Sequence, residues 1–102
     1  MTWLDAHLDL ACIAANGRDM HAPPDEINGP RANRPVGPWA PAAVTLASLR
    51  AGGVTRVLGT IFTETDGDGP EAYPAGDADA AHEAGLRQLR VYHNWVHDAG
   101  VH

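Results

Sequence analysis

The sequence predicts an α/β fold in which two strands belong to a parallel sheet. Its segments follow the order strand, loop, helix, strand, loop, helix, an alternation typical of βα units. A parallel pair needs helices on both faces, and two strands with two helices do not supply them. The 102 residues are therefore predicted to form the first two βα units of a larger (β/α)8 barrel, as the N-terminal fragment of a single domain that this chain leaves incomplete.

The first strand is expected over residues 3–10, where polarity alternates with period two. One face carries Leu4, Ala6, Leu8 and Leu10, and the other carries Trp3, Asp5, His7 and Asp9. At i and i+2, His7 and Asp9 share a face, so one metal ion can reach an imidazole nitrogen and a carboxylate oxygen together. The same pattern also fits a surface strand with its polar face in water, and the alternation alone leaves both interpretations open.

A long loop is expected over about residues 16–44, because this stretch contains six of the eight prolines. Trp39 in this stretch favours a loop that packs on the rest of the molecule. A short helix is predicted over residues 44–51, with Thr45 as its N-cap. Gly52 or Gly53 is expected in the left-handed conformation at its end.

The second strand is expected over residues 54–62, which are rich in β-branched and aromatic side chains. Gly59 within it indicates a bulge or a close backbone approach. The following loop, residues 63–77, is acidic, and Glu64 lies next to the strand end. Its Asp66 and Asp68 fit only the start of a calcium-loop pattern, so a solvated loop is expected.

A long helix is predicted from residue 79 to about residue 99, capped by Asp77 or Asp79 and ended by Gly100. Its expected apolar face comprises His82, Leu86, Leu89, His93 and Val96, with a smaller patch at Val91 and Trp95. His93 and His97 have the i, i+4 spacing of the zincin helix motif. Asn94 stands where that motif has its catalytic Glu, so His93 is expected to lie at the edge of the core and His97 to be exposed, with neither binding metal.

Composition and charge indicate which partners and which cellular location to expect. The formal net charge is −6, and the seven basic residues are scattered, which argues against a nucleic-acid partner. Cys12 is the only cysteine, and we expect it to be a small buried apolar residue rather than a nucleophile. Neither a signal peptide nor a membrane-spanning apolar run is visible, so a cytoplasmic protein is expected.

Three blocks of sequence resemble the N-terminal part of the membrane dipeptidase (renal dipeptidase) family. They are D-A-H-L-D-L at residues 5–10, L-A-S-L-R-A-G-G-V at residues 46–54, and T-I-F at residues 60–62. The resemblance extends along essentially all of the chain but covers about the first quarter of the family's barrel. Ala6 and Leu8 stand where the family has Gly and Asn, and both are expected to face away from the metal side.

The resemblance implies a zinc peptidase built on a TIM-like barrel of the metal-dependent hydrolases. In that family the His and the second Asp of the opening motif bind one zinc of a two-zinc site, and they correspond to His7 and Asp9. Asp5 is expected to be a hydrogen-bond partner of these ligands. The remaining family ligands, a bridging Glu and two His, come from later strands that this chain does not reach. The implied reaction is hydrolysis of a dipeptide, with the isolated chain inactive because two ligands do not hold a catalytic zinc.

Two alternatives remain open. One is a non-catalytic remnant that acts through self-association, as a homo-oligomer, or through docking to a partner, because two uncovered strands expose apolar surface. The other is a hydrolase of the same barrel superfamily with a different substrate, since His-x-Asp openings are not unique to dipeptidases.

Overall fold

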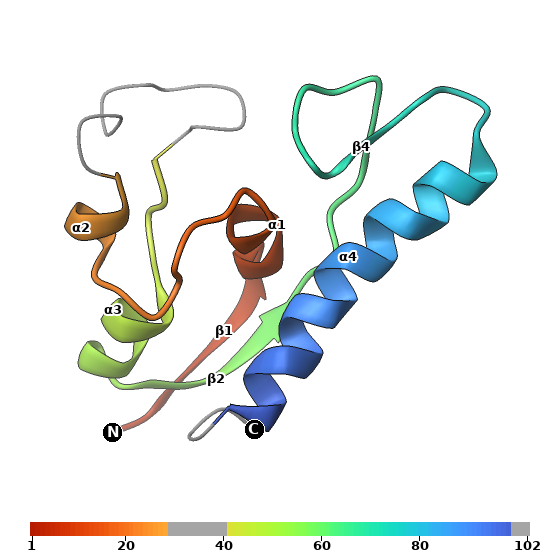
Figure 1. The fold of residues 1–102 in the computed structure, drawn as a ribbon. Coiled ribbons are helices and arrows are strands. Elements are labelled where there is room, and N and C mark those ends of the chain that lie inside the picture. The colour runs from red at the N-terminus through yellow and green to blue at the C-terminus, as the bar shows by residue number, and fades with distance from the viewer. Residues whose placement is uncertain (29–40, 99–102) are drawn as a thin grey trace.

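The computed structural model describes residues 1–28 and 41–98, and its centre is a parallel pair of strands (Figure 1). β1 (Trp3–Leu8) pairs in parallel with β2 (Val54–Gly59), as the alternation of elements predicts. α1 (Leu10–Ala15) follows at the carboxyl end of β1, and α4 (Ala78–His97) runs along one flank of the pair and packs against α1. The carboxyl ends of both strands thus lie beside α1 and α4.

The pairing of β1 with β2 is irregular. Its register joins Trp3 to Val54, Leu4 to Arg56, Asp5 to Val57 and Leu8 to Gly59, with a shift after the first pair and another after the third. β1 ends at Leu8 and not at residue 10 as predicted, because Leu10 already belongs to α1. The expected apolar face is also only partly buried. Leu8 and Leu10 reach the core, whereas Leu4 is 60% exposed.

The core lies between the sheet, α1, α3 (Leu46–Ala51) and α4. Its buried members are Leu10, Met20, Leu49 and Trp95. α3 begins with a capping box in which Thr45 accepts from the backbone N–H of Ser48 and the Ser48 hydroxyl accepts from the N–H of Thr45. Gly53 has a φ of 76°, so both the predicted cap and the predicted left-handed glycine are confirmed.

Part of the predicted long loop is helical. α2 (Pro24–Asn28) forms one short turn, with Asp25 and Glu26 in its first turn as the helix dipole favours. The Asn28 amide closes the loop by donating to Ala42 O at 3.0 Å and accepting from Ala42 N at 2.8 Å. The prediction for Trp39 lies outside the described residues.

The acidic segment after β2 has more structure than predicted. Two short strands, β3 (Glu64–Thr65) and β4 (Ala72–Tyr73), pair in parallel within it. The Arg87 guanidinium donates to Pro70 O at 2.8 Å and ties this segment to α4. The segment therefore caps the carboxyl end of the sheet beside α4 (Figure 1).

α4 begins where the sequence predicts but buries a different face. Asp77 caps it by accepting from Ala80 N at 2.9 Å, and the helix ends at His97. The predicted apolar face was wrong. Its His82, His93 and Val96 are exposed, and the buried residues are Ala84, Gln88 and Trp95. None of the helices formed by residues 1–28 and 41–98 has both the length and the apolarity needed to cross a membrane.

Candidate metal centre

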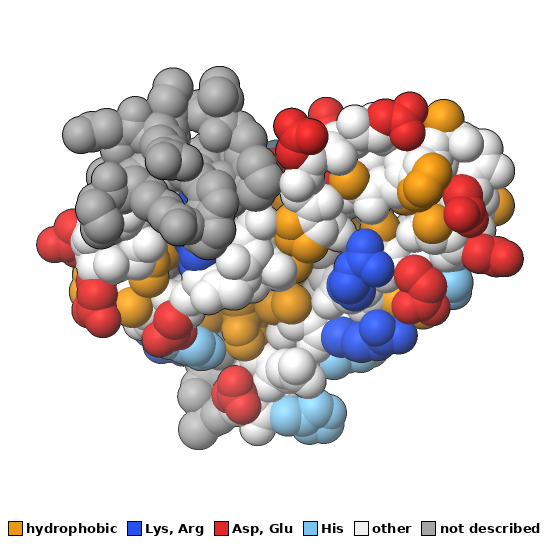
Figure 2. Space-filling view, turned by 45° about the horizontal axis from the view of Figure 1, so that its top comes forward, with side chains coloured by type: hydrophobic (Ala, Val, Ile, Leu, Met, Phe, Trp, Pro, Cys, Tyr) orange, Lys and Arg blue, Asp and Glu red, His pale blue; other side chains and the backbone are white. Residues whose placement is uncertain are grey.

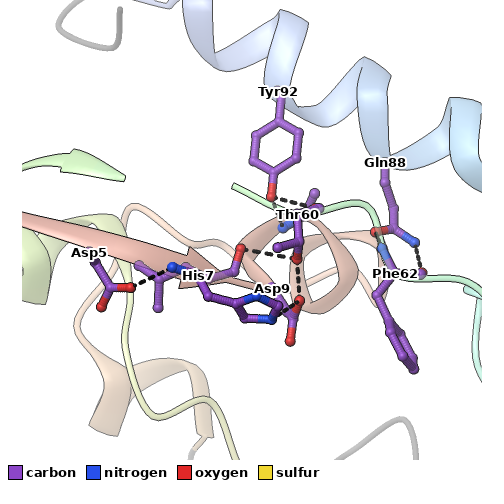
Figure 3. Close-up of polar contacts among 9 residues, drawn as sticks. Asp5, His7, Asp9, Thr60, Phe62, Gln88 and Tyr92 are labelled. Atoms are coloured by element: carbon purple, nitrogen blue, oxygen red, sulfur yellow. Dashed lines mark hydrogen bonds and ion pairs between the residues drawn. The ribbon is translucent and has the colours of Figure 1, made fainter. Parts of the chain in front are cut away.

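His7 and Asp9 lie side by side at the carboxyl end of β1 (Figure 3). His7 belongs to the strand, and Asp9 occupies the junction between β1 and α1. The Nε2 atom of His7 is 3.5 Å from Oδ1 of Asp9, and the two side chains are 73% and 47% exposed. The i, i+2 spacing predicted this proximity, and the exposure leaves both groups open to a ligand from solvent.

The Asp9 carboxylate does not cap the helix that begins directly after it. Asp9 is the N-cap of α1, where an aspartate ordinarily accepts from a backbone N–H of the first turn and contributes about 1 kcal/mol. Here the side chain makes no capping hydrogen bond. Its Oδ1 atom instead accepts a short hydrogen bond from the Thr60 hydroxyl. The carboxylate is thereby turned away from its own helix and toward His7.

Thr60 lies immediately after β2 and is fixed by its backbone. Its N–H donates to Leu8 O at 3.0 Å, which continues the pairing with β1. Its carbonyl accepts from the Tyr92 hydroxyl of α4 at 2.8 Å. The same Tyr92 oxygen accepts from Ala11 N in α1 at 3.4 Å. One phenol therefore joins α4 to the ends of both strands (Figure 3).

Tyr92 also accounts for Gly59. A Cβ at residue 59 would lie 2.7 Å from atoms of the Tyr92 ring, which is closer than side chains pack. The predicted close approach at Gly59 is confirmed. Burial raises the pKa of Tyr92; the N–H of Ala11 opposes this rise, and the negative charge of Asp9 adds to it.

Asp5 contacts His7 through the backbone. Its Oδ1 atom accepts from the His7 N–H at 3.0 Å. This bond fixes the backbone between Asp5 and His7, where the pairing with β2 is irregular, and it does not involve the imidazole. Asp5 thus supports the segment that presents His7, whereas Thr60 contacts the carboxylate of Asp9 directly.

The donor pair fits part of a metal site. Zinc bonds of 2.0–2.2 Å in a tetrahedral arrangement separate neighbouring donors by about 3.4 Å. The observed 3.5 Å between His7 Nε2 and Asp9 Oδ1 is close to this separation. A zinc site needs at least three protein ligands, and the described residues contain no group of three or more His, Cys, Asp or Glu side chains arranged to hold a metal. The pair therefore has the separation of two zinc ligands but lacks a third, and we call His7 and Asp9 the half-site below.

The side chain of Gln88 in α4 makes the two backbone hydrogen bonds that a neighbouring strand would otherwise make. Its side chain is fully buried, accepts from Phe62 N at 2.9 Å and donates to Phe62 O. An amide side chain can satisfy both backbone groups of one residue, as a paired strand does. Gln88 therefore fixes the chain just beyond β2 and explains why α4 buries a polar side chain.

Cys12 is surrounded by negative charge. Burial, followed by the charges of Glu71, Asp9 and Glu64, raises the pKa of the Cys12 thiol to about 11. A protonated thiol is a poor nucleophile and metal ligand. This environment supports the interpretation of Cys12 as a structural residue. It also places the acidic segment near the carboxyl end of β1.

None of the other histidines of residues 1–28 and 41–98 forms a group of three metal donors with this half-site. His93 and His97 are exposed on α4, as predicted for His97 but not for His93, which was expected at the edge of the core. His21 packs edge-to-face on Trp95 with ring centroids 6.2 Å apart, and its Nε2 atom is 4.0 Å from the Asp98 carboxylate. These contacts join the segment after α1 to the end of α4.

Sequence inspection missed three residues that organise the half-site: Thr60, Gln88 and Tyr92. The sequence does contain one signal for the buried face of α4: residues 84, 88, 91 and 95 recur at helical spacing and include Trp95. Because Gln88 in this row is polar, a search for apolar residues does not select the row.

The surface around the half-site is mixed. Acidic side chains gather at the end formed by the acidic segment and the start of α4, and apolar side chains are exposed near the middle of the same face (Figure 2). Comparisons of the chain with protein-family models, with curated proteins and with solved structures found no match.

Proposed function

We propose that this chain is the N-terminal part of a zinc-dependent, dipeptidase-like hydrolase on a metal-dependent-hydrolase barrel. The observation that carries the proposal is the exposed His7–Asp9 pair, with donors 3.5 Å apart at the carboxyl end of a parallel strand. Barrel enzymes build their active sites at this end of their strands. The resemblance of residues 5–10 to the opening motif of the membrane dipeptidase family supports the same assignment.

In this proposal, His7 and Asp9 each supply one ligand to a zinc ion. Zinc bound there supplies Lewis-acid chemistry for hydrolysis of the bond in a dipeptide substrate. Thr60 holds the carboxylate of Asp9, and Asp5 holds the backbone that presents His7. In this proposal the remaining ligands come from later strands of the barrel, as the resemblance implies, and the chain by itself is inactive. With a single cysteine and hence no internal disulfide, we place the protein in the cytoplasm.

The test is zinc content in the complete gene product that carries this chain. His7→Ala and Asp9→Asn should each remove about one zinc per chain, measured by mass spectrometry of the metal after dialysis, and should abolish dipeptide hydrolysis. The matched control is His93→Ala, which removes an exposed histidine of α4. Unchanged zinc content and activity in His7→Ala would show that this pair is not a metal site.

A second candidate function is a non-catalytic, self-associating module. It is favoured by large apolar side chains exposed on and just beyond the two strands: Trp3, Leu4, Leu58, Ile61 and Phe62. Such surface favours association with another copy or a partner. Sedimentation of the metal-free chain discriminates the two. A stable oligomer without zinc supports the module, and zinc binding that depends on His7 supports the hydrolase.

A further inference from the structure

We infer that Thr60 and Tyr92 are positioning residues that keep the Asp9 carboxylate available as a ligand, an inference that rests on the proposed function of the His7–Asp9 pair. Thr60 holds the carboxylate by a direct hydrogen bond. Tyr92 occupies the backbone donor that Asp9 would otherwise cap. Neither residue touches a metal in this scheme, and each acts through Asp9.

The first step concerns the Thr60 proton. The Thr60 hydroxyl lies near two acceptors, the Asp9 carboxylate and Leu8 O, the latter at 3.3 Å. A hydroxyl has one proton to donate. Leu8 O already accepts from the Thr60 N–H at 3.0 Å, and a carboxylate is the stronger acceptor. The proton therefore goes to Asp9. A carboxylate oxygen with one accepted hydrogen bond still has a lone pair for a ligand.

The second step concerns the start of α1. With Asp9 as the N-cap, Ala11 is the second residue of the helix, and its N–H is one that an N-cap side chain ordinarily receives. In this protein the Tyr92 hydroxyl receives it at 3.4 Å. The same hydroxyl donates its own proton to Thr60 O at 2.8 Å. Tyr92 thus substitutes for Asp9 at the helix start and also holds the backbone of Thr60.

These two steps explain why an aspartate in an N-cap position leaves its helix uncapped. Removal of the Thr60 hydroxyl should release the carboxylate. Removal of the Tyr92 hydroxyl should make the Ala11 N–H available, so that the carboxylate turns to cap α1. Both changes alter the side-chain rotamer of Asp9. They are also expected to weaken zinc binding, since outer hydrogen-bond partners of metal ligands contribute about 10–100-fold in affinity.

The experiment measures two quantities in the complete gene product that carries this chain, because two ligands alone do not hold zinc. The Asp9 χ1 rotamer is read without metal, from three-bond couplings between the backbone and Cγ in NMR spectra. Zinc affinity is read by competition with a chromophoric chelator. The variants are Thr60→Val and Thr60→Ala, which lack the hydroxyl, Thr60→Ser, which keeps it, and Tyr92→Phe. The matched controls are Thr55→Val, on the exposed part of β2, and Tyr73→Phe, whose hydroxyl bonds Thr65 in the acidic segment.

We expect one Asp9 rotamer in the wild type, in Thr60→Ser and in both controls. Averaging is expected in Thr60→Val and Thr60→Ala, and the helix-capping rotamer in Tyr92→Phe. Zinc affinity should fall about tenfold or more in Thr60→Val, Thr60→Ala and Tyr92→Phe, and Thr60→Ser should keep the wild-type affinity. Thr60→Val with the wild-type rotamer, or with the wild-type zinc affinity, overturns the inference. If the complete wild-type gene product binds no zinc, the proposed function fails, and the rotamers alone decide whether Thr60 and Tyr92 position Asp9.

Discussion

The carboxyl end of the β1–β2 pair is held by side-chain hydrogen bonds from α4, whereas the hydrogen bond that holds the amino end of the same pair joins backbone to backbone. At the carboxyl end, Tyr92 and Gln88 bond the backbone of Thr60 and Phe62. At the amino end, the Trp3 N–H donates to Gly53 O at 3.0 Å, and the side chains of Trp3 and Leu4 are more than half exposed.

The difference shows where this small structure fixes its side chains. Polar groups are held by hydrogen bonds next to His7 and Asp9, the pair that we propose as metal ligands. The amino end has no such requirement, and its apolar surface suits contact with further structure or another copy. Three experiments test how firmly the carboxyl end is packed and how it differs from the rest of the molecule.

The largest effect is expected for Gln88→Ala. This change leaves the N–H and C=O of Phe62 without their partner and opens a cavity at a fully buried position. The free energy of unfolding should fall by about 2–3 kcal/mol, measured by urea denaturation. The counterpart at the other end is Leu4→Ala, where a side chain already 60% exposed should cost less than about 1 kcal/mol. Equal losses in the two variants would remove the distinction between the ends.

The next effect is expected for Gly59→Ala. The added methyl would lie 2.7 Å from the Tyr92 ring, which cannot move away without losing its hydrogen bond to Thr60. Overpacking of this kind costs about 1–3 kcal/mol. The control is Gly85→Ala in α4, where the nearest atom is Ile61 Cγ2 at 3.7 Å. There the gain in helix propensity should stabilise the protein by up to about 1 kcal/mol. A neutral Gly59→Ala would mean that Tyr92 is not held against β2.

Signals confined to a few residues predicted the local structure correctly. Thr45 and Asp77 cap the helices that they were expected to cap, and Gly53 has the left-handed conformation. These features depend on hydrogen bonds between residues three apart or on the φ of one residue, so neighbouring sequence contains the information. The proximity of His7 to Asp9 was predictable for the same reason.

Features set by distant residues were not predictable. The buried face of α4 contains Gln88, which no count of apolar residues includes, because its burial depends on the backbone of Phe62. Thr60 is 51 residues from Asp9 in sequence, and Tyr92 is 81 residues from Ala11. Without knowledge of the pairing register, nothing in the sequence places these side chains together. Leu4 is likewise exposed despite its position on the predicted apolar face.

The smallest effect concerns Cys12, which reports on the environment of the carboxyl end. Its thiol pKa is raised to about 11, against a usual value of 9.0, chiefly by burial and then by Glu71. Because the thiolate is the reactive form, alkylation by iodoacetamide should be slow at pH 8 and should accelerate up to pH 11 in the folded chain. The raised pKa stabilises the folded state fully below pH 9, and this contribution is lost as the pH rises toward 11.

Glu71→Gln should shift the alkylation profile to lower pH, and Asp79→Asn, at the exposed start of α4, should leave it unchanged. A folded-state profile identical to that of the urea-unfolded chain would show that the carboxyl end is neither buried nor negatively charged around Cys12.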